Sequence, residues 1–136
     1  GAVTVHRGIS DEKLADLIAS AEVMVVPSLY EGFSLPAVEA LACGTPLVAS
    51  AAGALPETVG DAGVLVKPGD VEELVTEIKR FRVAPEHRAD YSARGRQRAL
   101  DKYSWVAVAR STVDVYEKEI ARRALSPVKG PQHVDR

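Results

Sequence analysis

The sequence predicts an α/β fold built on a partial, doubly wound parallel sheet of about four strands. Short apolar runs alternate along the chain with segments of helical periodicity, as in parallel strands joined by right-handed helical crossovers. The run from Val23 to Val26 is short and β-branched, which is typical of a strand buried on both faces. No internal repeat and no low-complexity tract favours another architecture.

The composition indicates one small domain, expected over residues 1 to 121, followed by a polar tail over residues 122 to 136. A chain of 136 residues that is 46% hydrophobic can bury one core but not comfortably two. Its 17 basic and 19 acidic residues are well mixed, so neither nucleic acid nor an anionic membrane is an expected partner. No apolar run is long enough for a membrane span. A single cysteine, Cys43, excludes an internal disulfide and a zinc cluster and fits a cytoplasmic location.

The first expected elements are a strand from Val3 to His6 and a helix from Asp11 to about Ser20. Ser10 is placed to cap this helix, because a serine hydroxyl accepts a hydrogen bond from a free N–H group of the first turn. Apolar residues at helical spacing predict the buried face of the helix. These residues are Leu14, Leu17, Ile18 and Ala21.

The central stretch reads as a strand from Val23 to Val26, a loop that begins at Pro27, and a helix. The loop ends at the N-terminus of the helix and at the C-terminal end of a parallel strand. Free N–H groups and the helix dipole favour an anion at this position. The residues expected to begin or end the helix are Ser34, Pro36, Gly44 and Pro46.

Candidate ligand-binding groups cluster at the same place. Gly32 lets the backbone come close to a ligand. Glu31 lies just before the helix and Glu39 about one turn into it. Either carboxylate alone reads as a solvated surface group, but the spacing of the residues around them favours a site in which both point into one crevice.

Two further strands are expected, from Pro46 to Ser50 and from Gly63 to Val66. Small residues from Ala51 to Ala54 form a loop between them, followed by a short helical turn from Leu55 to Val59. This loop either makes room for a ligand or packs tightly, so none of its residues is assigned to the site.

The second half of the chain reads as helical scaffold. Asp70 caps a helix whose predicted buried face consists of Leu74, Val75, Ile78 and Phe81, and Ser104 caps the last helix. A polar helix from about Glu86 to Lys102 lies between them. Acidic residues interleave with its arginines, so a solvated face is favoured over a phosphate-binding surface. These arginines are Arg88, Arg94, Arg96 and Arg98.

The central motifs resemble the C-terminal donor-binding domain of GT-B glycosyltransferases, in the retaining group called family 4 or glycosyl transferases group 1. The resemblance covers about residues 3 to 120 and implies a Rossmann-like domain. Ser34 stands where the family most often has glycine, and Ala54 where it often has a second glycine. The matching segments include Pro27-Ser28, Glu31-Gly32-Phe33, Pro36, Glu39-Ala40, Cys43-Gly44-Thr45-Pro46, Gly53, Pro68-Gly69-Asp70 and Tyr103-Ser104-Trp105.

The resemblance implies transfer of a sugar from a nucleotide-diphosphate sugar to an acceptor, with retention of anomeric configuration and without a metal ion or cofactor. Glu39 would accept hydrogen bonds from the ribose hydroxyls. Glu31, the candidate catalytic residue, would contact the donor hexose near its reacting carbon. Backbone N–H groups would hold the donor sugar and diphosphate. They belong to Gly32, Phe33, Ser34 and Leu35.

The resemblance also implies that parts of the family's architecture lie outside this sequence. Family members have an N-terminal acceptor domain and two further strand and helix units, which carry a pair of basic residues that hold the diphosphate. We therefore expect the acceptor to bind mainly outside this chain and the chain alone to be inactive. Two alternatives are a nucleotide-sugar-binding module without catalysis and a subunit that depends on a partner.

The usual strand order of a doubly wound sheet adds one structural expectation. Strands at Val3 to His6 and at Val23 to Val26 would be separated by a gap if the first two strands of the sheet are absent. Either these two strands pair directly or another chain fills the gap. An open sheet edge favours self-association.

Overall fold

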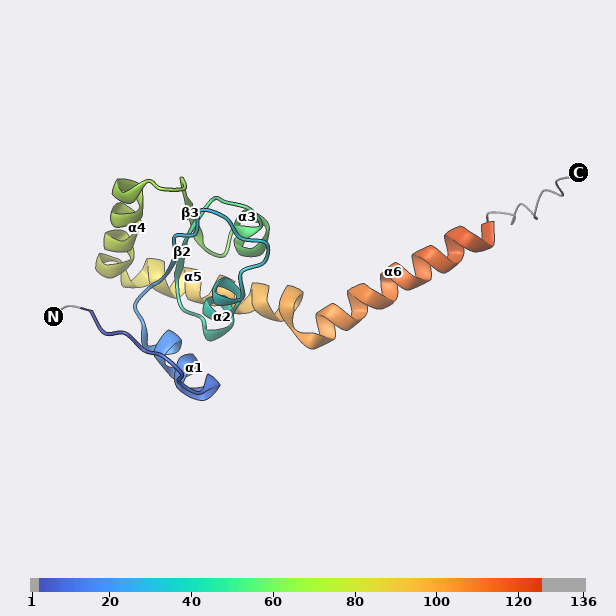
Figure 1. Ribbon diagram of the computed structural model, residues 1–136, viewed down its shortest axis with the longest axis horizontal. Coiled ribbons are helices and arrows are strands. Elements are labelled where there is room, and N and C mark those ends of the chain that lie inside the picture. Colours follow the sequence, from blue (N-terminus) through green and yellow to red (C-terminus); the bar gives the residue numbers. More distant parts are fainter. Residues whose placement is uncertain (1–2, 126–136) are drawn as a thin grey trace, which may run out of the picture. The chain divides into compact units, whose positions relative to one another are not determined.

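The computed structural model describes residues 3 to 125 (Figure 1). The chain divides into two units, Gly1–Tyr103 and Ser104–Arg136, and each is described by itself. The first unit contains a sheet of three parallel strands in the order β1-β2-β3. The α/β class and the parallel sheet are confirmed, with three strands in place of about four. These strands are β1 (Met24–Val26), β2 (Leu47–Ser50) and β3 (Val64–Val66).

The central strand β2 is buried along its whole length. Val48 pairs with Val25 on one side and Val64 on the other. Because helices cover a parallel sheet on both faces, its middle strand has no solvent-facing side. This explains why Leu47 and Val48 are both fully buried although they point to opposite faces.

The expected strand from Val3 to His6 is not formed. Val3 is 82% exposed and Val5 is 70% exposed, so this β-branched segment packs against little. A strand gains its hydrogen bonds from a neighbour, and within the described residues β1 pairs only with β2. Direct pairing between the Val3 to His6 segment and β1 is therefore absent from the structure, and the sequence prediction was wrong on this point.

Helix α1 (Asp11–Ser20) has the expected bounds, and the Ser10 hydroxyl accepts a hydrogen bond from the Lys13 N–H group. Its buried face is narrower than predicted. Ile18 is buried, whereas Leu17 is 42% exposed and Ala21 is also exposed. Among the described elements the main neighbour of α1 is α2, so a single line of side chains is enough to make the contact.

Helix α2 (Leu35–Cys43) is the centre of the core. Ala37, Ala40 and Leu41 are completely buried, against the sheet and the short helix α3 (Leu55–Val59). Gly44 ends α2 at a φ of 71°, a left-handed conformation that favours glycine. The predicted start and stop of this helix are confirmed.

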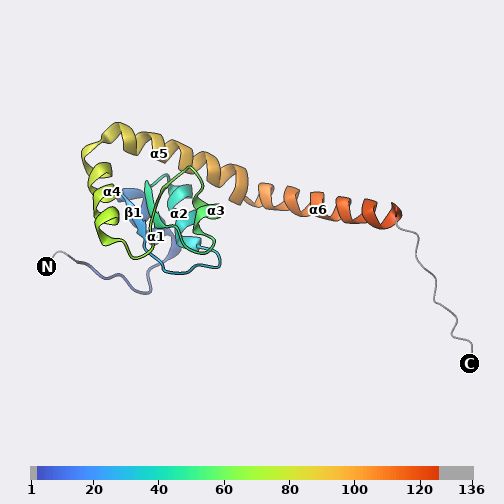
Figure 2. The same ribbon diagram turned by 90° about the horizontal axis from the view of Figure 1, so that it is seen from above.

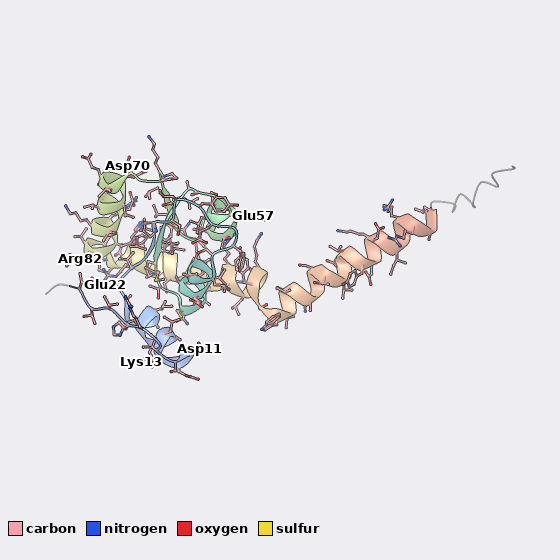
Figure 3. All side chains as sticks on the ribbon, viewed as in Figure 1. Asp11, Lys13, Glu22, Glu57, Asp70 and Arg82 are labelled. Carbon is pink, nitrogen blue, oxygen red and sulfur yellow. The ribbon has the colours of Figure 1, made fainter. Side chains whose placement is uncertain are left out.

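A second core cluster lies on the other face of the sheet under α4 (Val71–Val83). Asp70 caps α4 by accepting a hydrogen bond of 2.9 Å from the Glu73 N–H group. Phe81 is fully buried against Val48 and Val66, whereas Val75 of the predicted buried face is 40% exposed. Outside this cluster, Arg82 Nε lies 3.6 Å from Glu22 Oε2, and Figure 3 shows these two side chains on adjacent segments.

Helix α5 (Pro85–Arg98) runs along the outside of the first unit and continues as the π-helical turn η1 (Ala99–Tyr103) (Figure 2). Its arginines do not form the solvated face that the sequence predicted, because each donates to backbone carbonyl groups of other segments. The acceptors are Phe81 O and Arg82 O for Arg88, Asp61 O for Arg94, Cys43 O for Arg96, and Glu57 O and Thr58 O for Arg98.

Two glycines provide the space for these arginines. A Cβ atom on Gly44, the residue after α2, would collide with the Arg96 side chain, and one on Gly60, after α3, would collide with the Arg98 guanidinium. The last carbonyl groups of a helix lack intrahelical partners. Arg96 and Arg98 therefore dock α5 onto the C-terminal ends of α2 and α3 by filling those acceptors.

The second unit contains helix α6 (Trp105–Leu125). The Ser104 hydroxyl accepts a hydrogen bond of 3.2 Å from the Ala107 N–H group, which confirms the predicted cap. The helix continues past the expected start of the tail at residue 122, and Glu119 pairs with both Arg122 and Arg123 there. The expected tail from residue 126 onward lies outside the described residues. No helix within residues 3 to 125 is both long and apolar enough to cross a membrane.

Candidate functional site around the start of α2

The loop from Pro27 to Ser34 connects the C-terminal end of β1 to the N-terminus of α2, as the sequence predicts. The Ser34 side chain is completely buried and its hydroxyl accepts a hydrogen bond of 3.4 Å from the Ala37 N–H group. Pro36 has no N–H group. The cap and the proline therefore remove two of the free donors that a helix N-terminus normally presents.

The remaining donors are unpaired. Within the described part of the chain, the backbone N–H groups of four consecutive residues donate to no protein acceptor. They are also at the positive end of the α2 dipole, where a negative charge is stabilised. These residues are Gly32, Phe33, Ser34 and Leu35.

Neither the backbone conformation nor the packing of the protein requires a glycine at position 32. Its φ is not in the left-handed region, and a Cβ atom built on it would meet nothing within 4 Å. Open space therefore lies in front of the backbone at the middle of the unpaired donors. This arrangement allows a ligand to approach the main chain closely.

Glu31 is held in place by both its backbone and its side chain. The Ala54 N–H group donates to the Glu31 carbonyl oxygen at 2.8 Å, and the Ser28 hydroxyl donates to Glu31 Oε1 at 2.8 Å. Gly53, at a φ of +54°, packs so closely that a Cβ atom there would collide with the Glu31 carbonyl oxygen. The small-residue loop from Ala51 to Ala54 thus supports the backbone of Glu31, and Ser28 orients its carboxylate.

Sequence reasoning left Gly53 and Ala54 out of the site. The available signal was a run of small residues at the same end of the sheet as Glu31. That run left open whether the space is filled by a ligand or by protein. The structure shows that, at Gly53, protein backbone fills it.

Glu39 lies one turn after Leu35 on α2 and lines a cavity of about 160 Å³ between α1 and α2. The other lining residues are Asp11, Leu14, Ala15, Ile18, Ala42 and Cys43. Figure 3 shows Asp11 at the start of α1. Glu31 is not one of the residues that line this cavity, so the two carboxylates border different parts of the α2 N-terminal region.

Phe33 and Leu35 are exposed apolar residues next to the unpaired donors, in addition to Leu29 and Tyr30 earlier in the loop. The side chains of Phe33 and Leu35 are 54% and 61% exposed, respectively. The Phe33 ring packs edge to face with the Tyr103 ring, at 6.1 Å between centroids and 67° between planes. Tyr103 is the last residue of the π-helical turn η1 and the first residue of the motif Tyr103-Ser104-Trp105.

Residues 1–98 match the family described as Glycosyl transferases group 1. The chain belongs to this family. The match includes the whole stretch from β1 to α2, which contains the central motifs of the resemblance. The α/β fold around the unpaired donors of α2 lies within the part of the chain that matches this family.

Known members of the group 1 family cover most of the chain. The MMP alpha-(1->4)-mannosyltransferase of Mycolicibacterium hassiacum is 58% identical over 125 residues, which are 90% of this chain and 30% of that protein. The solved structure of sucrose-phosphate synthase from Thermosynechococcus elongatus has a TM-score of 0.72 at 39% identity, and the match covers 84% of this chain and 29% of that chain.

A third similar protein was solved with a nucleotide. The structure of Anabaena HepE in complex with UDP has a TM-score of 0.69 at 26% identity, over 75% of this chain and 29% of that chain. The chain thus spans 29 to 30% of the length of these three proteins.

Proposed function

We propose that this chain supplies half of the donor site of a retaining glycosyltransferase, which transfers a sugar from a nucleotide-diphosphate sugar to an acceptor. The observation that carries the proposal is the row of four unpaired N–H groups at the N-terminus of α2, next to an open Gly32. During transfer the bond between the sugar's anomeric carbon and the diphosphate breaks, and negative charge develops on the leaving diphosphate. Donors fixed in advance at a helix N-terminus stabilise such charge.

The assigned roles follow from where each group lies. Backbone N–H groups from Gly32 to Leu35 bind the diphosphate and the donor sugar. Glu31, oriented by Ser28 and the Ala54 N–H group, lies next to those donors in sequence and contacts the hexose near its reacting carbon. Glu39, at the groove between α1 and α2, accepts hydrogen bonds from the ribose hydroxyls.

The cavity between α1 and α2 that Glu39 lines is small for a whole nucleotide. Its volume of about 160 Å³ is below the range of roughly 300 to 1,000 Å³ that is usual for small-molecule sites. This supports a half-site, with the rest of the donor and most of the acceptor bound by parts of the protein outside this chain. The proposed reaction uses no metal ion and no cofactor, and the nucleotide sugar is its substrate.

The relatives indicate which donors to test first. HepE was solved with UDP, and the M. hassiacum relative is named as a mannosyltransferase. A nucleoside diphosphate carrying mannose is therefore the first complete donor to test on this chain, with UDP, GDP and ADP as the simplest probes.

A second candidate function is nucleotide-sugar binding without turnover. The observation in its favour is that three arginines of α5 donate to backbone carbonyls and so are engaged in holding the fold. Arginine makes strong charge-assisted hydrogen bonds to phosphate, and these three side chains already donate elsewhere. This makes the chain by itself a binding half-site, whether or not the whole protein is an enzyme. These arginines are Arg94, Arg96 and Arg98.

A titration of the chain with UDP, GDP and ADP, followed by backbone amide NMR shifts, tests the proposal. We expect shifts concentrated at Gly32 to Leu35 and at Glu39, and no hydrolysis of a nucleoside diphosphate mannose. Glu57→Ala is the matched control, since Glu57 is an exposed carboxylate on α3 (Figure 3). A folded chain that shows no shifts at millimolar nucleotide would contradict both candidate functions.

A further inference from the structure

Tyr103 is the first residue of the Tyr103-Ser104-Trp105 motif, to which the proposed function assigns no role. It is half-buried at the end of η1 and joins two segments that are far apart in sequence. Its ring packs edge to face on the ring of Phe33, and its hydroxyl donates to the Thr58 carbonyl oxygen at 3.0 Å. One side chain thus links the end of α3 to the loop of the proposed donor site.

The π-helical turn explains how Tyr103 reaches both partners. In a regular α-helix, residues five apart such as Arg98 and Tyr103 point in directions about 140° apart. A π-helical turn, with hydrogen bonds between residues i and i+5, brings such residues to nearly the same face. Accordingly, Arg98 Nε and the Tyr103 hydroxyl both donate to the Thr58 carbonyl oxygen, at 2.9 and 3.0 Å.

Phe33 is less enclosed by protein than Glu31 and Ser34 on either side of it. Glu31 is held by the Ala54 N–H group, and the buried Ser34 caps α2. Phe33, between them, is 54% exposed, and its one aromatic ring contact in the described chain is with Tyr103. Loss of the Tyr103 ring would therefore remove this aromatic contact of Phe33.

We propose that Tyr103 is a positioning residue of the donor site. Anchored through its hydroxyl on Thr58, it holds the Phe33 ring and so keeps the N–H groups of Gly32, Phe33 and Ser34 aimed at the bound diphosphate. This inference rests on the proposed function for its ligand. Preorganisation of this kind raises affinity because less conformational freedom is lost on binding.

The expected size of the effect follows from the contact itself. An edge-to-face aromatic pair contributes an amount that corresponds to about a 2- to 10-fold change in an equilibrium constant. Removal of the ring should therefore weaken nucleotide binding by about 2- to 10-fold. This loss of affinity should exceed the loss caused by general destabilisation of the fold. A destabilised chain that is still folded presents the same N–H groups to the nucleotide.

The test uses the 136-residue chain with three substitutions: Tyr103→Leu, Tyr103→Phe and the control Tyr91→Leu. Tyr91 also packs edge to face, with Phe81 at 5.3 Å between centroids, but it belongs to the separate core cluster under α4. The measurements are amide ¹⁵N relaxation of Gly32 to Ser34 without ligand, the dissociation constant for UDP, and urea unfolding.

We expect Tyr103→Leu to increase the mobility of the Gly32 to Ser34 amides and to weaken UDP binding. Tyr103→Phe keeps the ring but loses the hydroxyl anchor on the Thr58 carbonyl oxygen, so both changes should be smaller than in Tyr103→Leu. Tyr91→Leu should lower stability without changing the loop. Unchanged loop mobility in Tyr103→Leu, or an equal change in Tyr91→Leu, would overturn the inference.

The relaxation measurement separates this inference from the proposed function. If the unsubstituted chain binds no nucleotide, the proposed function fails, and loop mobility still decides whether Tyr103 holds Phe33. If UDP binds with equal affinity to the chain with tyrosine or leucine at position 103, the proposed function stands and the positioning role of Tyr103 is rejected.

Discussion

Replacement of Gly53 by alanine is expected to disrupt the packing of the Ala51 to Ala54 loop against the Glu31 backbone and to destabilise the first unit. The left-handed φ of +54° costs a non-glycine residue about 1 to 2 kcal/mol. The new Cβ would also collide with the Glu31 carbonyl oxygen, and loss of the Ala54 N–H bond to that oxygen costs about 0.5 to 1.5 kcal/mol. Together these effects lower the free energy of unfolding by roughly 1.5 to 3.5 kcal/mol.

Gly32→Ala is the matched control for this prediction, because the same substitution falls on the same loop. Position 32 has an ordinary φ and no atom within 4 Å of a built Cβ, so stability should stay the same or rise by about 0.4 to 1 kcal/mol. Urea unfolding followed by far-UV circular dichroism measures both variants. Equal stability of Gly53→Ala and Gly32→Ala would refute the claim that Gly53 supports the Glu31 backbone, and with it the proposed orientation of Glu31.

Three further predictions follow. Arg98→Lys should lower the free energy of unfolding by about 1 to 3 kcal/mol, because lysine cannot reproduce the donation to the two carbonyl groups at the end of α3. Urea unfolding measures this change, with the substitution Arg80→Lys at an exposed arginine as the control. Equal unfolding midpoints of the two variants would contradict the prediction. Glu39→Ala should weaken nucleotide binding by about 1 to 3 kcal/mol, measured by NMR titration against Glu57→Ala, and unchanged affinity would remove its assigned role. The open edge of Met24–Val26 should lead to self-association, and a monomer mass in light scattering would exclude it.

The first-turn caps are the part of this structure that sequence reasoning predicted best. Ser10, Ser34, Asp70 and Ser104 each accept a hydrogen bond from an N–H group three residues later. Such a bond lies within one helical turn, so a short stretch of sequence contains both partners. The same locality explains why the start and end of α2 were predicted correctly.

Predictions that depended on a distant partner were less successful. Val3 to His6 has the composition of a strand, yet no neighbour pairs with it in the described structure. The arginines of α5 looked like solvated charges, because their acceptors lie up to 53 residues away, as for Arg96 and Cys43 O. A carbonyl group carries no residue-specific signal, so composition cannot reveal that an arginine binds it.

The candidate site divides in the same way. The sequence by itself determined the glycine-containing loop after a parallel strand, the helix that follows it and the two carboxylates, because these features are contiguous between Val25 and Glu39. Only the tertiary structure decided that Gly53 buttresses Glu31 and that Tyr103 packs on Phe33. The physical reason is that these contacts join segments brought together by packing on the sheet, and no local pattern encodes which side chains then meet.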